Sequence, residues 1–396
     1  MIRYGSRFFY RYSKIKEKAA SPCSMASFSF LLRIICLLVF IAGTGVAKGQ
    51  TIRGYILDSM TGNPLKDVSV YVNKTTKGTI SNENGYFELT YNNYPFQLIF
   101  SHISYKPRIM DMNHALSARL KVTLAPKYKH IQEVAIYDKN ERDNLVSYFE
   151  DSFLGTDDWG KSASIVNDSV LFFMVEYYGN PSGREHDHEI KKMEVTATEP
   201  IHILLPDLGY ELYYTLLEYR EICDLAHGSI TTLLRGFRHY NEIIPEEGRQ
   251  RKKIERNRLE AYYNSPRHFL RSLCHKELKQ NGYELTHWFL DHDIDSTHHL
   301  VYTQIEAAED MTRVIGLKDK WLPICYIGKK RAPLNLKERD VYFAEPVYSR
   351  ARFLKDTVII NKDGITGDYS VMFAPVMGSK RIGATLPADY YPEKHY

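Results

Sequence analysis

The chain has 396 residues, of which 44% are hydrophobic and 25% are charged, and its formal net charge at pH 7 is +4. This length suits about two folded domains, and a charge so close to balance gives no general argument for nucleic-acid binding. Three cysteines follow the N-terminal segment, at Cys223, Cys274 and Cys325. Their odd number and wide spacing exclude a disulfide framework, and they leave open three buried thiols or one bonded pair.

The first 49 residues have the pattern of a secretion signal. Basic residues precede an apolar run at 28–42, and the small residue Gly49 stands at a position that a signal peptidase reads. The run is interrupted by Arg33 and is short for a membrane span of about 20 residues. We therefore expect a signal peptide at 1–49, with Met25 as an alternative start, and export across the inner membrane to the periplasm or the outer membrane.

Residues 50–137 are expected to form a compact β-sandwich. Apolar residues open a strand near residue 52, and the segment 61–64 supplies glycine, asparagine and proline for a turn. Residues 68–72 then alternate with a period of two, which is typical of a half-buried strand. Further strand patterns follow at 75–80, 86–89, 96–103, 120–124 and 134–137.

These turn and strand residues resemble the carboxypeptidase regulatory-like domain. The residues that carry the resemblance are Gly54, Asp58, Thr61, Gly62, Pro64, Leu65, Val68, Val70, Thr76, Gly78, Thr79, Gly85, Phe87 and Leu89. The resemblance implies a small transthyretin-like β-sandwich, a domain that also stands at the front of TonB-dependent outer-membrane receptors that import glycans. Ser104 departs from the family, which commonly has glycine there.

The run 138–144 is almost entirely charged or polar and is interpreted as a linker. Residues 145–396 are expected to form a second domain of the α+β class that begins as antiparallel sheet. Strand patterns occur at 170–178, 193–205, 210–219 and 230–240, and again at 285–290, 299–305, 321–327, 341–346 and 358–360.

A helical pair is predicted between these two groups of strands. Acid at Glu246 and Glu247 favours the start of a first helix, because the exposed backbone amides there attract negative charge. The first helix is expected to run to Tyr263. Ser265 then provides an N-cap with proline at the first helical position, and Gly282 is expected to close the second helix.

The second region is also similar to a set of secreted bacterial proteins that carry the same front domain. The residues that support this likeness are Phe153-Leu154-Gly155, Leu208-Gly209-Tyr210, Tyr213, the run 261–270 and Leu386-Pro387-Ala388-Asp389-Tyr390. The likeness implies no particular activity.

Two polar runs have partial metal-site spacing. His186-Asp187-His188-Glu189 contains the His-x-x-Glu arrangement of zinc carboxypeptidases, but its highly charged flanks are typical of an exposed loop. The run 291–295 starts like a calcium loop, yet Ser296 and Tyr302 stand where glycine and a carboxylate are required. We therefore assign no catalytic, cofactor-binding or metal-binding residue, and no cofactor.

Two further features bear on partners. The 30 tyrosines are compatible with strand and core positions or with stacking on sugar rings. A cluster of basic residues is compatible with a solvated helix face or with anionic lipid or glycan. This cluster consists of Arg249, Arg251, Lys252, Lys253, Arg256 and Arg258.

The sequence thus predicts a non-enzymatic cell-envelope protein that recognises a protein or glycan partner, with peripheral association to the outer membrane as a further expectation. The β-sandwich would serve as a docking module whose sheet edge can accept a strand. The alternative is a zinc-dependent carboxypeptidase or a related hydrolase.

Overall fold

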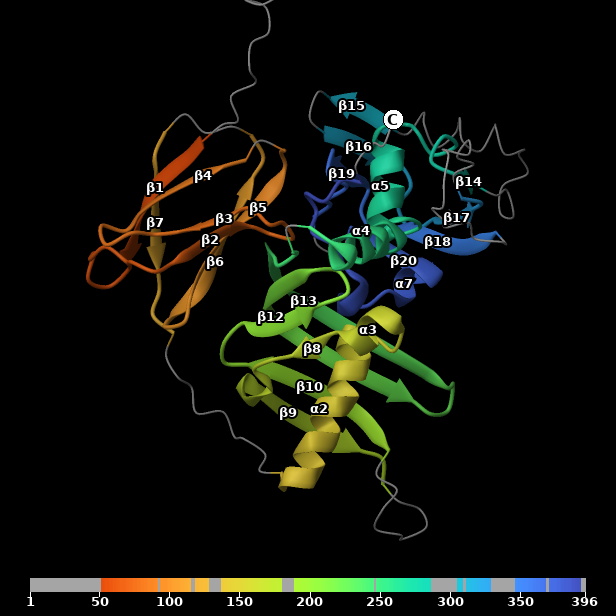
Figure 1. Ribbon diagram of the computed structural model, residues 1–396, viewed down its shortest axis with the longest axis horizontal. Coiled ribbons are helices and arrows are strands. Elements are labelled where there is room, and N and C mark those ends of the chain that lie inside the picture. The colour runs from red at the N-terminus through yellow and green to blue at the C-terminus, as the bar shows by residue number, and fades with distance from the viewer. Residues whose placement is uncertain are drawn as a thin grey trace, which may run out of the picture. The chain divides into compact units, whose positions relative to one another are not determined.

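The computed structural model describes residues 51–91, 93–114, 118–127, 137–179, 189–245, 247–285, 305–308, 311–328, 346–367 and 370–392. Its first part confirms the β-sandwich (Figure 1). One sheet has the order β4-β1-β7 and the other has the order β3-β2-β5-β6. The strands are β1 (Thr51–Asp58), β2 (Ser69–Val72), β3 (Gly78–Ile80), β4 (Tyr86–Thr90), β5 (Phe96–His102), β6 (Tyr105–Met112) and β7 (Leu120–Leu124).

The two layers of the sandwich share one apolar core. Alternate residues of β1 and β4 point inward, and the rings of Phe87 and Phe100 meet edge to face across the layers with centroids 5.4 Å apart. Strand β6 was not predicted, because Pro107 and Arg108 interrupt its alternation and only its last residue, Met112, is buried. The predicted strand at 134–137 lies mostly outside the described residues.

The next part is a six-stranded sheet with helices on one face (Figure 1). The long strand β12 is the central strand of this sheet. It pairs with β13 along one side and with β11 and then β10 along the other. The strands are β8 (Ser164–Ile165), β9 (Leu171–Tyr177), β10 (Ile190–Ala197), β11 (Ile201–Leu205), β12 (Tyr210–Asp224) and β13 (Ser229–Glu242).

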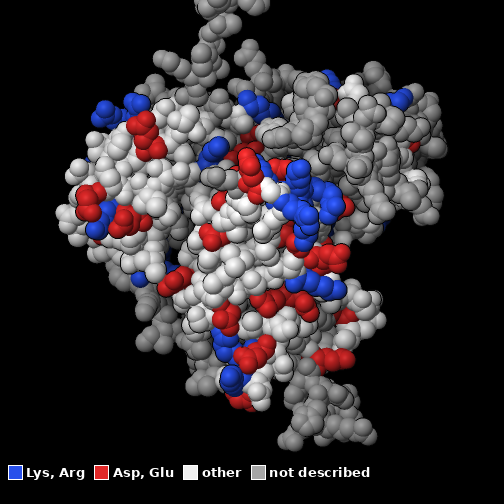
Figure 2. All heavy atoms as spheres, in the orientation of Figure 1, with Lys and Arg blue, Asp and Glu red and all other residues white. Residues whose placement is uncertain are grey.

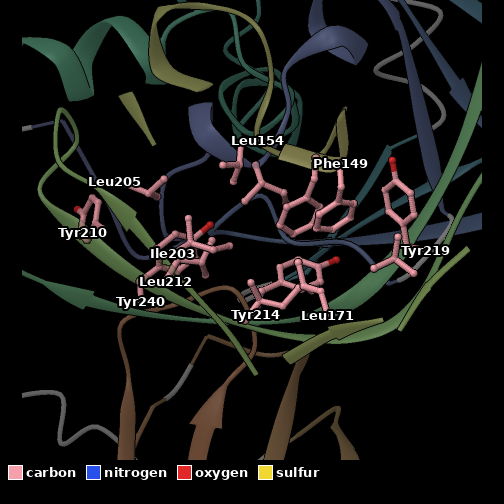
Figure 3. Packing of buried hydrophobic residues seen from close by; sticks show 14 of the residues in the cluster. Phe149, Leu154, Leu171, Ile203, Leu205, Tyr210, Leu212, Tyr214, Tyr219 and Tyr240 are labelled. Carbon is pink, nitrogen blue, oxygen red and sulfur yellow. The ribbon is translucent and has the colours of Figure 1, made fainter. Parts of the chain in front are cut away.

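Helix α2 (Lys139–Leu154) packs its apolar stripe on this sheet, followed by α3 (Asp158–Ser162). The rings of Phe149 and Phe153 stack 4.9 Å apart, and Tyr219 of β12 meets Phe149 edge to face. Figure 3 shows this core, in which Phe149 of the helix lies beside Tyr219 of the sheet.

The helix α2 corrects the prediction of a linker at 138–144. Asp138 is the N-cap, and its carboxylate accepts the backbone N–H of Glu141 at 2.9 Å. The charged residues that suggested a linker form the first turns of the helix, where they remain largely exposed. The apolar stripe begins only at Leu145, so the polar start was mistaken for a separate segment.

The predicted helical pair is confirmed as α4 (Arg249–Tyr262) and α5 (Pro266–Cys274), with corrected ends. Ser265 caps α5 as expected, since its hydroxyl accepts the backbone N–H of His268 at 3.1 Å. Helix α4, however, starts after Gly248 and has no acid in its first turn. Helix α5 ends at Cys274 rather than near Gly282, and the chain turns at Lys276 with a φ of 58°.

The last part contains two small sheets that enclose a separate apolar core beneath α5. One sheet has the order β14-β17-β18-β20 and the other β15-β16-β19. Their strands are β14 (Tyr283–Leu285), β15 (Ile305–Ala308), β16 (Met311–Ile315), β17 (Trp321–Tyr326), β18 (Val347–Phe353), β19 (Thr357–Asn361) and β20 (Val371–Pro375), followed by α7 (Val376–Ser379). Most of the predicted strands at 285–290, 299–305 and 341–346 lies outside the described residues.

The region 145–396, which was predicted as one α+β domain, therefore holds two apolar cores, one under α2 and one under α5. From Gln50 to Tyr396 the chain nevertheless forms one compact unit. Within the described ranges, none of the helices combines the length and apolar character needed to cross a membrane.

Candidate functional site

The β-sandwich is joined to the six-stranded sheet by backbone hydrogen bonds. Lys74 donates its N–H to the carbonyl of Arg238 at 2.8 Å, and Tyr240 donates its N–H to the carbonyl of Thr75 at 3.1 Å. Asn73 adds a side-chain oxygen that accepts the N–H of Arg238 at 3.0 Å. The loop after β2 thus pairs with β13 in the manner of a short strand, which fixes the direction of the sandwich relative to the sheet.

The C-terminal segment around Ala388 and Asp389 also forms hydrogen bonds with the loop after β2. Ala388 donates its N–H to the carbonyl of Lys74 at 2.6 Å. The carboxylate of Asp389 accepts the backbone N–H of Thr76 at 3.0 Å and the hydroxyl of Thr76 at 2.5 Å. Since segments more than 300 residues apart in sequence meet here, the sandwich and the rest of the unit are expected to unfold together.

A cleft of about 510 Å³ opens beside this junction, between the outer face of β2 and β3 and the face of β12 and β13 that points away from α2. We call it the inter-sheet cleft. Its polar and aromatic lining residues are Ser69, Tyr71, Thr79 and Ser101 from the sandwich, and Tyr213, Thr215, His239 and Asn241 from the sheet. The remaining lining residues are Val70, Gly78, Ile80 and Pro200, so among the described residues no Lys, Arg, Asp or Glu contributes to the wall.

Aromatic rings support both walls of the inter-sheet cleft. The ring of Tyr71 lies 5.0 Å from that of His239, and its hydroxyl is 3.4 Å from the hydroxyl of Thr215. Burial raises the pKa of Tyr71 to about 12, so its hydroxyl keeps its proton. On the sheet, the ring of Tyr213 is stacked on His202 at 4.7 Å with an angle of 4° between the planes. Tyr71 is only 4% exposed, so the cleft offers the half-buried ring of Tyr213 together with neutral hydrogen-bonding groups.

Among the residues that line the inter-sheet cleft, His239 is the one whose ordinary pKa lies near physiological pH. Burial lowers its pKa below the ordinary value of 6.5, although the charge of Asp389 opposes the shift. A folded-state pKa below the unfolded value means that folding favours the neutral ring. Its contribution to stability is therefore present above pH 6.5 and is lost as the pH falls.

We accordingly expect His239→Gln to reduce the loss of unfolding free energy that the protein shows on acidification below pH 6.5. Denaturant unfolding at a series of pH values measures this slope. His227→Gln serves as the control, because that side chain is 79% exposed at the β12–β13 turn. An unchanged slope in His239→Gln would contradict the assignment.

A second cavity, of about 360 Å³, lies where α4 and the C-terminal segment meet the sandwich. Its charged lining residues are paired with one another. Arg258 contacts Glu242 at 2.5 Å, Arg251 contacts Glu255 at 2.8 Å, and Lys77 lies 4.0 Å from Asp389; these residues all line the cavity. The pairing leaves little charge for a ligand, so the inter-sheet cleft is the better candidate site.

The basic cluster predicted on the first helix divides into residues with different surroundings. Arg258 is buried, with its guanidinium 4.0 Å from the ring centre of Tyr210 and hydrogen bonds to the carbonyls at 208 and 209. Figure 2 shows the exposed Lys and Arg side chains gathered over α4. Those that the structure places at the surface include Arg249, Lys252 and Arg256.

The two partial metal motifs fall mostly outside the described residues. His186 and His188 and the run 291–295 are not described, and only Glu189 is, where its carbonyl accepts the N–H of Tyr178 at 2.9 Å. Over the described part of the chain, no group of three or more His, Cys, Asp or Glu side chains is placed to hold a metal ion.

None of the cleft residues had been selected from the sequence as a site. The available signal was the alternation along β12 and β13, which places Tyr213, Thr215, His239 and Asn241 on one face of the sheet. That alternation does not reveal that the sandwich faces this surface, because the covering strands come from more than 130 residues earlier in the chain.

Comparison with known families matches residues 52–136 to the CarboxypepD_reg-like domain. The chain thus carries a domain of this family at its front, and the resemblance of the sequence is confirmed there. No curated protein matches the chain.

Three solved structures illustrate what the fold comparison finds. A chain of a type II Cohesin–X-Dockerin complex from Acetivibrio cellulolyticus is 24% identical, with 19% of this chain and 52% of that chain covered and a TM-score of 0.16. A protein from Bacteroides fragilis, described as membrane-associated and of unknown function, is 11% identical, with 50% and 99% covered and a TM-score of 0.16. A 9R-lipoxygenase from Cyanothece is 11% identical, with 60% and 50% covered and a TM-score of 0.17. TM-scores this low support no conclusion about fold or function.

Proposed function

We propose that this protein is a non-enzymatic recognition protein of the cell envelope, and that it binds a neutral glycan in the inter-sheet cleft. The observation that carries the proposal is the composition of the cleft wall. Its described residues include two tyrosines, a histidine, four serine or threonine hydroxyls and an asparagine, and none of them is Lys, Arg, Asp or Glu. Sugars present flat apolar ring faces together with many hydroxyls, and such a lining offers a partner for each.

The volume and attachment of the cleft support this function. About 510 Å³ lies in the usual range for small-ligand sites and accommodates a short oligosaccharide segment. The loop at 73–76 is hydrogen-bonded to β13 and to the C-terminal segment, so both walls are held in place before a ligand arrives. A preformed site loses less conformational entropy on binding, which favours affinity.

The sandwich would therefore act as one wall of the binding site rather than as a separate docking module on a flexible linker. A neutral lining also favours neutral over acidic glycans, because a buried carboxylate or sulfate on the ligand would find no Lys or Arg among the described lining residues.

Glycan-array binding followed by calorimetric titration tests the proposal. We expect binding to neutral oligosaccharides, such as hexasaccharides of glucose, xylose or mannose, and weaker binding to uronic-acid or sulfated glycans. Tyr213→Ala is expected to weaken the affinity for the best neutral glycan by about tenfold or more, because the ring that stacks on His202 is removed.

Tyr348→Ala is the matched control, since that tyrosine is 61% exposed on β18 and lies outside the cleft lining. Equal affinities in the two variants would place the glycan elsewhere. Binding to a protein in envelope extracts, with no glycan bound by the array, would overturn the glycan assignment.

We also propose export to the periplasm or the outer membrane, with the segment 1–49 removed. Expression of the full chain in a Gram-negative host, followed by intact-mass measurement of the envelope fraction, is expected to give a product that starts at Gln50. A cytoplasmic product that retains the segment would contradict the proposed location.

A further inference from the structure

Three arginine side chains gather beneath the junction of the sandwich, β13 and α5. They are Arg238 on β13, and Arg267 and Arg271 one turn apart on α5. Among the described residues, none of the three makes an ion pair within 4.0 Å, although sixteen such pairs occur elsewhere in the same part of the chain. Buried guanidinium groups normally have a carboxylate partner, so this cluster needs an explanation.

Arg271 is satisfied by neutral oxygens alone. It donates to the carbonyl of Asp363 at 3.1 Å, to the carbonyl of Tyr390 at 2.8 Å, to the carbonyl of Ala388 and to the hydroxyl of Tyr262 at 3.3 Å. Its positive charge is therefore not cancelled by a direct partner.

The nearby carboxylate of Asp363 is occupied by other donors. Tyr91 donates its hydroxyl at 2.6 Å, Asn93 donates its amide at 2.7 Å, and Tyr391 donates its hydroxyl to the other oxygen. The carboxylate of Asp363, in the turn after β19, therefore accepts hydrogen bonds from the sandwich and from the C-terminal segment rather than from the three arginines.

Arg238 and Arg267 each have one donor without a partner, although other donors of Arg238 bond the hydroxyls of Tyr214 and Tyr240. Nε of Arg238 and Nη1 of Arg267 are both buried and make no hydrogen bond. Burial, together with the positive charges of Arg271 and Arg238, lowers the pKa of Arg267 to about 10. Taken as whole residues, Arg238 and Arg267 are half-buried rather than fully buried.

We propose that Arg238 and Arg267 hold one small oxyanion of the phosphate or sulfate type. Guanidinium donors match the oxygens of such anions in direction, and one anion would both satisfy the two free nitrogens and offset the excess positive charge. The site is independent of the glycan cleft, whose walls contain neither arginine.

Calorimetric titration of the mature protein with inorganic phosphate, and separately with sulfate, tests the proposal. We expect saturable binding of one anion per chain, and a rise of the melting temperature with phosphate that exceeds the effect of chloride at equal ionic strength. Arg267→Met is expected to lose at least tenfold in phosphate affinity and to lose the temperature shift.

Arg249→Met is the control, because it removes a cation from the exposed face of α4 and should keep both effects. If Arg267→Met does not fold, the titration of the unaltered protein decides alone. An absence of saturable binding up to about 10 mM would overturn the proposal, because so weak a site would stabilise the fold little at lower concentrations. Equal phosphate shifts in Arg267→Met and the unaltered protein would overturn it as well.

Discussion

Replacing Arg271 with methionine is expected to lower the free energy of unfolding by about 3–5 kcal/mol, one of the two largest single effects in this protein. The substitution leaves the buried carbonyls of Asp363 and Ala388 and the half-buried carbonyl of Tyr390 without their donor. Each buried acceptor without a partner costs about 1–3 kcal/mol, and methionine restores packing volume but no hydrogen bond. Because these carbonyls fix the C-terminal segment to α5, the loss should also loosen the loop that holds the sandwich.

Denaturant unfolding measures this prediction, with Arg256→Met on the exposed face of α4 as the control. The control is expected to change the free energy of unfolding by less than about 0.5 kcal/mol. A comparably small change in Arg271→Met would show that the carbonyls find other donors, and it would contradict the role given to this arginine.

The second large effect is expected for Phe149→Ala, which should lower the free energy of unfolding by about 3–5 kcal/mol. Phe149 is fully buried, stacks on Phe153 and meets Phe173 and Tyr219 edge to face (Figure 3). Its removal leaves a cavity between α2 and the sheet that rigid strands on the other side cannot fill.

Met174→Ala on β9 provides the comparison, since that side chain is 60% exposed on the opposite face of the sheet. It should change stability by less than about 0.5 kcal/mol. If Phe149→Ala were equally mild, α2 would not be an integral part of this core and the interpretation of 139–154 as a packed helix would fail.

The sequence predicts those elements whose signals are local. The β-sandwich follows from period-two alternation and from turns rich in glycine and asparagine, and the cap at Ser265 follows from the residue pair that starts α5. Helix α2 was missed because its first six residues are polar and its apolar stripe starts late. The end of α5 was misplaced because Leu278 continues the apolar pattern after the chain has left the helix.

The candidate site could not be predicted for a different reason. Tyr71 and Tyr213 are ordinary strand residues in the sequence, and they face one cleft only because the loop at 73–76 pairs with β13. The role of Arg267 could not be predicted either. In the sequence it is one more basic residue near the start of a helix, and only the structure shows that it is buried next to Arg271. Contacts between distant segments decide both features, and local patterns carry no information about them.

Hydrogen–deuterium exchange with and without the best neutral oligosaccharide tests the central claim most directly. We predict that the sugar slows exchange on both walls of the inter-sheet cleft, at 69–71 and 78–80 in the sandwich and at 213–215 and 239–241 in the sheet. Protection confined to other parts of the chain, or no protection at a saturating sugar concentration, would contradict the assignment of this cleft as the recognition site.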